Sequence, residues 1–127
     1  MIDKTKAFSG FSVNDLQQAK DFYGKTLGLE VSEAQMPGAL NLKINNNTIF
    51  VYQKDNHQPA SFTILNFPVD NVEKTVDELT NKGIQFERYS GGEIATNDKG
   101  IHEEENMKIA WFKDPAGNYL SILEGGL

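Results

Sequence analysis

Cysteine is absent from this sequence of 127 residues, and its absence removes several classes of site at once. Disulfide bonds, thiolate zinc sites, iron–sulfur clusters and cysteine nucleophiles all require that residue. Long apolar runs are also missing, since no stretch approaches the roughly 18 apolar residues of a membrane-spanning helix. We therefore expect no membrane partner. Residues 1–6 lack the apolar stretch of a signal peptide, so we expect a cytoplasmic location.

Basic residues are outnumbered by acidic ones. Eighteen Asp and Glu residues stand against twelve Lys and Arg residues, which leaves a formal net charge of −6. Such a charge repels phosphate backbones and anionic lipids, so the composition argues against nucleic acid as a partner. The net charge does not argue against neutral or cationic small molecules as ligands. Apolar residues make up 39% of the chain and charged residues 24%, as in an ordinary globular protein, and we expect one domain over 1–127.

An internal repeat organises the chain. Residues 11–16 (FSVNDL) reappear 56 positions later as residues 67–72 (FPVDNV), and each copy leads into an amphipathic stretch that ends in glycine, at Gly28 and Gly83. Capping signals predict where both helices begin, at Asn14 in the first copy and at Asp70 in the second. Apolar residues three or four apart mark the buried helical faces: Leu16, Ala19, Tyr23 and Leu27, then Val72, Val76 and Leu79.

Strand-like segments surround each predicted helix, so that each copy is expected to be βαβββ. The predicted strands are 7–13, 29–33, 40–44 and 48–54 in the first copy, and 61–69, 85–89, 108–113 and 119–123 in the second. Tight turns are predicted at 45–47 and 114–117. The fold class is therefore α+β, with modules of about 6–55 and 60–125. Residues 90–106 do not fit the repeat and are expected to form a long polar loop.

These motifs resemble the vicinal-oxygen-chelate superfamily, which includes glyoxalase I, extradiol dioxygenases, methylmalonyl-CoA epimerase and the bleomycin and fosfomycin resistance proteins. The resemblance rests on residues 14–16 (NDL), on 21–23 (DFY) and 27–29 (LGL) in the first predicted helix, and on 111–118 (WFKDPAGN). It covers nearly the whole chain. It implies two tandem modules whose curved mixed sheets surround a cleft, with the helices outside.

The metal ligands of this superfamily are missing from the sequence. The resemblance implies a histidine five residues before the valine of the first strand of each module, and these positions hold Phe8 and Ile64. The ligand of the last strand falls at Ser121, and the remaining one falls near Ile49 or Phe50. Divalent ions need several converging oxygen or imidazole donors. We therefore expect no metal cofactor and no metal-assisted chemistry.

Strand alternation predicts which side chains line the cleft that the resemblance implies. Phe11 and Val13 are assigned to the helix side, which leaves the alternate positions of that strand for the cleft. Trp111 is either an aromatic wall or a core residue, and Asn66 either contacts a ligand or satisfies a neighbouring backbone group. The candidate ligand-binding residues are Phe8, Gly10, Ser12, Tyr52, Ile64, Asn66, Trp111 and Ser121.

Groups that could carry chemistry are few. Glu124 is the weak candidate for a catalytic base, and the alternative is a plain charge on an edge strand. The sequence His102-Glu103-Glu104-Glu105 is interpreted as a solvated acidic loop, and His57 as a surface residue of a polar linker. The chain contains neither the Gly-x-Ser-x-Gly elbow of a serine hydrolase nor a phosphate-binding glycine loop.

Three functional hypotheses follow. The first is a metal-independent small-molecule-binding protein of this superfamily, with a sequestering or resistance role. The second is a metal-free lyase or isomerase that acts on a small carbonyl or aromatic substrate and uses Glu124, Asn66 or an acid of the long loop. The third is a homodimeric interaction module without a small ligand. The first accounts best for apolar and small residues at the implied cleft.

Overall fold

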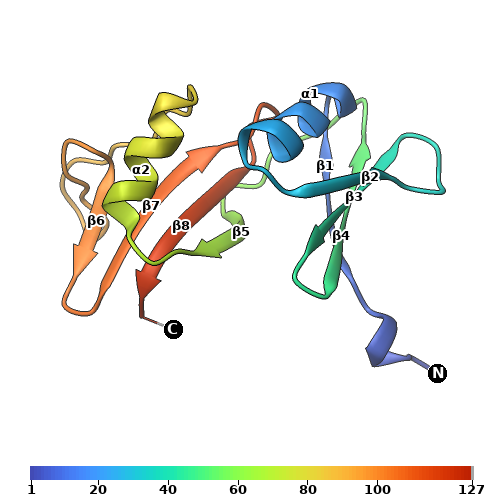
Figure 1. Ribbon diagram of the computed structural model, residues 1–127, viewed down its shortest axis with the longest axis horizontal. Helices are drawn as coiled ribbons and strands as arrows, with labels where there is room; N and C mark the ends of the chain where they lie inside the picture. Colours follow the sequence, from blue (N-terminus) through green and yellow to red (C-terminus); the bar gives the residue numbers. More distant parts are fainter. Residues whose placement is uncertain (127) are drawn as a thin grey trace. The chain divides into compact units, whose positions relative to one another are not determined.

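The computed structural model describes residues 1–126 and divides the chain into two compact units, Met1–Pro59 and Ala60–Leu127. Each unit contains a four-stranded mixed sheet and an α-helix, as Figure 1 shows. The boundary follows Pro59, at the end of the polar segment between the two predicted modules. The predicted α+β class with two βαβββ repeats is therefore confirmed.

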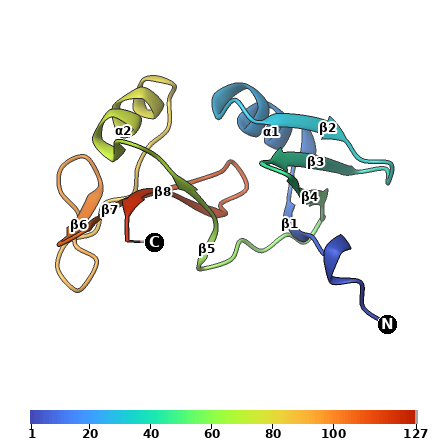
Figure 2. The ribbon, with the colours of Figure 1, turned by 60° about the horizontal axis from the view of Figure 1, so that its bottom comes forward.

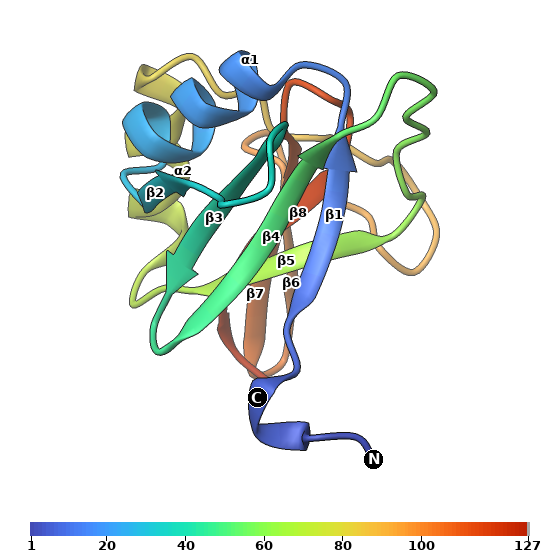
Figure 3. The ribbon, with the colours of Figure 1, turned by 90° about the vertical axis from the view of Figure 1, so that its right-hand side faces the viewer.

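The first unit has the strand order β1-β4-β3-β2, in which β1 runs parallel to β4 and the other pairs are antiparallel. Figure 3 shows β1, β4 and β3 side by side. Parallel strands need a crossover connection, which is usually helical, and the helix after β1 is part of that connection here. Its elements are η1 (Lys4–Lys6), β1 (Ser9–Val13), α1 (Leu16–Asp21), η2 (Phe22–Thr26), β2 (Glu30–Glu33), β3 (Ala39–Ile44) and β4 (Asn47–Gln53).

The second unit repeats this topology with the order β5-β8-β7-β6. Its first strand again runs parallel to its last, and α2 again provides the crossover. Figure 2 shows α2 on one side of the β6-β7-β8 strands. The elements are β5 (Thr63–Pro68), α2 (Val72–Asn81), β6 (Ile101–Glu104), β7 (Met107–Lys113) and β8 (Tyr119–Gly125).

Each core lies between a sheet and its helix. In the first unit Leu40, Leu42 and Val51 are buried on the strands and Tyr23 is fully buried beneath them, with its ring 5.8 Å from that of Phe11. In the second unit α2 packs on β7 and β8. Burial alternates toward the end of β7, whereas four consecutive residues of β8 are buried. The buried residues there include Val72, Val76, Ala110, Phe112, Leu120 and Ile122. Period-two alternation on the strands thus separates a helix side from an opposite face.

Helix starts differ from the prediction by one residue. The side chain of Asp15 accepts from the Gln18 N–H at 3.0 Å, and that of Asn71 accepts from the Lys74 N–H at 2.9 Å. The predicted caps at positions 14 and 70 are therefore wrong. In both copies two neighbouring residues carry capping oxygens, and only the backbone geometry selects the second.

The first predicted helix changes its winding before it ends. α1 stops at Asp21 and a π-helical turn, η2, follows, in which the Leu27 N–H donates to the Phe22 carbonyl at 2.9 Å. Such a turn inserts one extra residue and shifts the buried face. The predicted stop signals are confirmed, since Gly28 has φ +73° and Gly83 has φ +96°.

The predicted strand 85–89 is wrong. Of that segment Phe86 alone forms a bridge, with Phe112, and the edge strand of the sheet is instead β6. β6 lies inside the segment 90–106 that was expected to be a loop. Its residues Glu103 and Glu104 are exposed, because an edge strand borders water, so the sequence carries no apolar alternation there. The turns are confirmed: Asn45 has φ 59°, and Gly117 N–H donates to the Asp114 carbonyl at 3.0 Å.

No helix within residues 1–126 combines the length and the apolar character that crossing a membrane would require.

Candidate functional site

An open hollow of about 220 Å³ lies in the second unit, and we call it the aromatic hollow. Trp111 and Tyr119 line it from β7 and β8. Their neighbours Phe112 and Leu120 are fully buried on the helix side, so alternation places the two lining residues on the opposite face. The complete lining is Ser61, Phe62, Thr63, Tyr89, Ile94, Trp111 and Tyr119.

A bulge in β5 brings Thr63 into this lining. Thr63 pairs with Tyr119 and Leu65 pairs with Leu120, so Ile64 is the extra residue between them. A bulge of this kind interrupts the alternation of the strand. Thr63 thereby lines the hollow beside Tyr119, whereas Ile64 does not line it.

The rim of the aromatic hollow exposes large apolar side chains. Phe62, just before β5, is 68% exposed, and Ile94, in the loop between α2 and β6, is 48% exposed. Keeping apolar surface in water costs about 25 cal/mol per Å². A ligand that covers these two side chains would recover part of that free energy.

The aromatic rings inside the hollow form an ordered cluster. The Tyr89 ring meets the Trp111 ring edge to face, with centroids 5.9 Å apart. Burial raises the pKa of the Tyr89 hydroxyl, and the neighbouring Tyr119 adds to the increase. The hydroxyl therefore stays protonated at neutral pH and keeps its hydrogen-bond donor.

Charges next to the hollow compensate each other. The Lys113 ammonium lies 5.0 Å from the centroid of the Tyr119 ring and 3.7 Å from a Glu87 carboxylate oxygen. The nearby Glu87 charge raises the pKa of Lys113, which therefore stays charged. Because the two charges of this ion pair offset each other, the pair adds little net charge beside the hollow.

The structure brings three predicted residues of the second unit into one row. Ser121 pairs with Asn66 on one side and with Trp111 on the other, across β5, β8 and β7. The Ser121 hydroxyl donates to Asn66 Oδ1 at 2.5 Å, and Ser121 is fully buried while Asn66 is exposed. This bond fixes the orientation of the Asn66 amide.

The predicted residues of the first unit also share one face, that opposite α1. Gly10 pairs with Phe50 and Ser12 pairs with Tyr52 on β1 and β4. The Phe50 ring stacks on that of Tyr52 with centroids 6.0 Å apart, and it meets the exposed Phe8 ring edge to face at 6.1 Å. A side chain at position 10 would come within 3.0 Å of the Phe50 carbonyl oxygen, so glycine permits this packing.

Glu124 faces α2. Its carboxylate oxygen accepts a hydrogen bond from the Val72 N–H at 2.8 Å, at the first turn of that helix. The pairing of Glu124 with Lys108 places both residues on the helix side of the sheet. Trp111 and Ser121 lie on the other face, so the geometry gives Glu124 a helix-capping role and keeps it apart from the aromatic hollow.

Both histidines differ from their interpretation as plain solvated residues. His102 lies in β6 and is 8% exposed, and its ring is bonded at both nitrogens. Nδ1 lies 2.9 Å from the Ala95 carbonyl oxygen, and Nε2 lies 3.1 Å from a Glu104 carboxylate oxygen. His57 is half-buried, with its Nδ1 2.6 Å from the Ser12 hydroxyl oxygen. In both cases tertiary contacts bury a ring whose local sequence is polar.

The residues at the superfamily's metal positions do not fit a divalent cation. Phe8 and Phe50 present aromatic rings, and Ile64 is the aliphatic bulge residue. The Ser121 hydroxyl is already bonded to Asn66. One engaged hydroxyl is an inadequate donor set, because such ions take several oxygen or nitrogen ligands. Among residues 1–126, no three His, Asp or Glu side chains gather as a metal site would require.

Sequence reasoning identified one residue of the aromatic hollow, Trp111, and missed the other six. Tyr119 stands two positions before Ser121 on the same strand, so alternation was a sufficient signal for it. Thr63 depends on the bulge. Tyr89 and Ile94 reach the hollow from a segment outside the regular strands, where no periodicity applies.

Comparison with known proteins gives a family and a fold. The sequence model described as the Glyoxalase/Bleomycin resistance protein/Dioxygenase superfamily matches residues 7–122. The uncharacterized protein YraH of Bacillus subtilis (strain 168) is 27% identical over 124 residues, which cover 87% of this chain and 90% of that protein.

Solved structures share the fold at low sequence identity. A putative glyoxalase family protein from Bacillus anthracis matches with a TM-score of 0.70 and 21% identity, covering 98% of this chain and 99% of that one. A lactoylglutathione lyase from Agrobacterium tumefaciens matches with a TM-score of 0.67 and 21% identity, covering 94% of each chain. TnmS3, an antibiotic binding protein from Streptomyces sp. CB03234, matches with a TM-score of 0.62 and 20% identity, covering 95% and 97%.

Proposed function

We propose that this chain, which belongs to the Glyoxalase/Bleomycin resistance protein/Dioxygenase superfamily, is a metal-independent binding protein for an uncharged aromatic small molecule, with a sequestering role. The observation that carries the proposal is the aromatic hollow, whose apolar rim residues Phe62 and Ile94 stay exposed without a ligand. TnmS3, which shares the fold, is an antibiotic binding protein and gives the sequestering role a precedent.

The size of the hollow limits the ligand. A dry apolar cavity of about 150 Å³ accepts benzene. The open volume of about 220 Å³ therefore suits a substituted single ring or two fused rings. Tyr89 and Trp111 would contact the ring by edge and face, and the Tyr89 hydroxyl and Ser61 would supply polar contacts at its edge.

The enzymatic alternative has less support. A metal-free lyase or isomerase needs a base that reaches the substrate. Glu124, the candidate base, is bonded to the Val72 N–H on the opposite face of the sheet from Trp111. The homodimer and the cytoplasmic location stay predictions, and sedimentation velocity at micromolar concentration tests the first of them.

Binding is tested with four compounds that together vary ring size, aromaticity and charge: benzyl alcohol, 2-naphthalenemethanol, cyclohexylmethanol and benzyltrimethylammonium. Trp111 is the only tryptophan, so its fluorescence reports on the hollow directly, and calorimetry gives the dissociation constant. We expect the two neutral aromatic alcohols to bind after chelator treatment, and the aliphatic and cationic compounds to bind more weakly. The absence of any fluorescence change and of any thermal shift with all four compounds would refute the proposal.

A pair of variants locates the site. Phe62→Ser should weaken binding of 2-naphthalenemethanol about ten-fold, because covering an exposed phenylalanine contributes about 1.4 kcal/mol. Met36→Ser is the matched control, since Met36 is 62% exposed in the β2–β3 loop and does not line the hollow. Equal losses in the two variants would contradict binding at the aromatic hollow.

A further inference from the structure

The loop that carries Ile94 is attached to the rest of the unit by few groups. Residues 90–95 are closed off at their base, where the Tyr89 N–H donates to the Thr96 hydroxyl at 2.8 Å and the Thr96 N–H donates to the Tyr89 carbonyl at 2.9 Å. Gly91 and Gly92 both have positive φ, at +73° and +75°. We call residues 90–95 the rim loop.

Within the rim loop, a single hydrogen bond reaches the remainder of the described chain. It joins His102 Nδ1 to the Ala95 carbonyl oxygen at 2.9 Å. Ala95 directly follows Ile94, the rim residue of the aromatic hollow. The His102 ring also lies 6.3 Å from the Trp111 ring, centroid to centroid, at an interplanar angle of 37°. The same side chain therefore touches the loop and stands next to the floor of the hollow.

The protonation of His102 follows from its partners. Both ring nitrogens lie within hydrogen-bond distance of an oxygen that can only accept, the Ala95 carbonyl and the Glu104 carboxylate. A ring that satisfies both must carry a proton on each nitrogen. The charge that faces the His102 ring is the Glu104 carboxylate, which lies on β6 itself. The neighbouring strand β7 presents two uncharged residues, Ile109 opposite His102 and Trp111 beside its ring.

We infer that His102 is a positioning residue of the aromatic hollow, which holds the rim loop through Ala95 while its ring is doubly protonated and thereby makes ligand affinity depend on pH. This inference rests on the proposed function. Loss of one proton leaves a lone pair facing an acceptor, so the bond to Glu104 is lost or the bond to Ala95 is lost. A bond to Ala95 that survives loses its charge assistance and about half its strength.

The Ala95 carbonyl and then the Glu104 side chain raise the pKa of His102 above its ordinary value of 6.5. The imidazolium form therefore predominates below pH 6.5 and is lost as the pH rises through the folded pKa. The rim loop should accordingly be held most firmly in mildly acidic solution and least firmly in mildly alkaline solution.

The first test needs no ligand. The ¹H shift of the Ile94 δ-methyl group, recorded against pH, reports its distance from the Trp111 ring, and the His102 Cε1 signal gives the pKa. We expect the methyl shift to move toward its random-coil value with the midpoint of His102. In His102→Gln the amide can still donate to Ala95, so the shift should stay near its acidic value at every pH. A methyl titration that persists in His102→Gln would overturn the inference.

The second test measures affinity for 2-naphthalenemethanol, which does not titrate, at pH 6 and pH 8.5. We expect roughly a five-fold weaker affinity at pH 8.5 in the native protein, because a charge-assisted bond is about twice as strong as a neutral one. His102→Gln should bind equally at both pH values, His102→Leu should bind weakly at both, and His57→Gln, the control in the first unit, should behave as the native protein. A pH-dependent affinity in His102→Gln would refute the role.

The two proposals fail in different ways. If 2-naphthalenemethanol does not bind at either pH while the Ile94 methyl titrates with His102, the proposed function is wrong and the attachment of the rim loop to His102 stands. If the compound binds with an affinity that is independent of pH in the native protein, the positioning role is wrong and the proposed function stands.

Discussion

Replacement of Glu124 by alanine separates a structural from a catalytic role for this residue. Its carboxylate accepts from the N–H of Val72, which is fully buried at the first turn of α2. Hydrogen bonds to charged groups contribute about 1.5–3 kcal/mol, and loss of a helix cap costs about 1 kcal/mol. We expect a loss of about 1.5 kcal/mol in the free energy of unfolding, because water can reach part of the vacated position.

This free energy converts into a measurable change of melting temperature. A chain of 127 residues has an unfolding entropy of about 0.27 kcal/mol/K when it unfolds in one transition. The expected loss therefore lowers Tm by about 6 °C, as followed by circular dichroism. Glu124→Gln retains an acceptor oxygen and should lose about a third as much.

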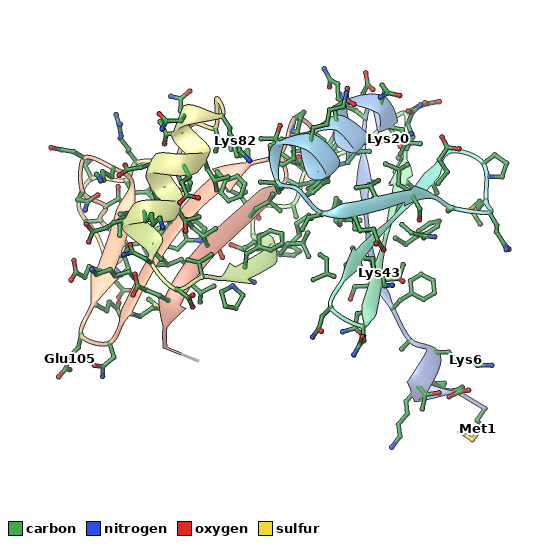
Figure 4. The ribbon with its side chains drawn as sticks, viewed as in Figure 1. Met1, Lys6, Lys20, Lys43, Lys82 and Glu105 are labelled. Carbon is green, nitrogen blue, oxygen red and sulfur yellow. The ribbon has the colours of Figure 1, made fainter. Side chains whose placement is uncertain are left out.

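Glu105→Ala is the matched control, since it removes the same charge at the β6–β7 hairpin tip, where Figure 4 shows Glu105 directed outward. Its Tm should change by less than about 2 °C, as expected for a surface substitution. Affinity for 2-naphthalenemethanol should be unchanged in Glu124→Ala. Lost binding or activity together with an unchanged Tm would show that the acid acts at the site, and the capping argument would be refuted.

Three further predictions concern stability. Gly100→Ala should lower Tm far more than Gly91→Ala, although both glycines have positive φ. A Cβ atom at position 100 would lie 2.7 Å from a backbone carbonyl oxygen, whereas a Cβ atom at position 91 would meet open space. Asp114→Ala should lower the free energy of unfolding by about 2–4 kcal/mol, because the Asp114 carboxylate accepts from two backbone N–H groups and from the Asn118 side-chain amide. A denaturant titration that gives a smaller loss for Asp114→Ala than for Glu124→Ala would contradict this account. Stability should decline as the pH rises above 6.5, since folding raises the pKa of His102, and an unchanged decline in His102→Gln would assign it to another group.

Several features of this protein were determined by its sequence alone. The repeated FSVNDL and FPVDNV segments, with Gly28 and Gly83 after each helix, are local signals, and a local signal can be read without knowing what packs against it. They predicted two βαβββ modules, both helix ends and the two turns, all of which the structure contains. Alternation on β1 also placed Phe11 and Val13 on the helix side, where the Phe11 ring contacts Tyr23 and Val13 is buried.

The tertiary structure decided the edge strand and the aromatic hollow. β6 is polar because it borders water, so its pairing with β7 is visible only when the sheet is assembled. Because of the bulge at Ile64, Thr63 lines the hollow in place of the predicted Ile64. Tyr89 and the rim-loop residue Ile94 reach the hollow from outside any regular strand. His102 became buried and hydrogen-bonded at both ring nitrogens, to the Ala95 carbonyl and to Glu104. Every residue carries a backbone carbonyl, so no sequence pattern marks the Ala95 contact. Contacts between backbone atoms and distant side chains thus built the site, and they depend on geometry that periodicity does not encode.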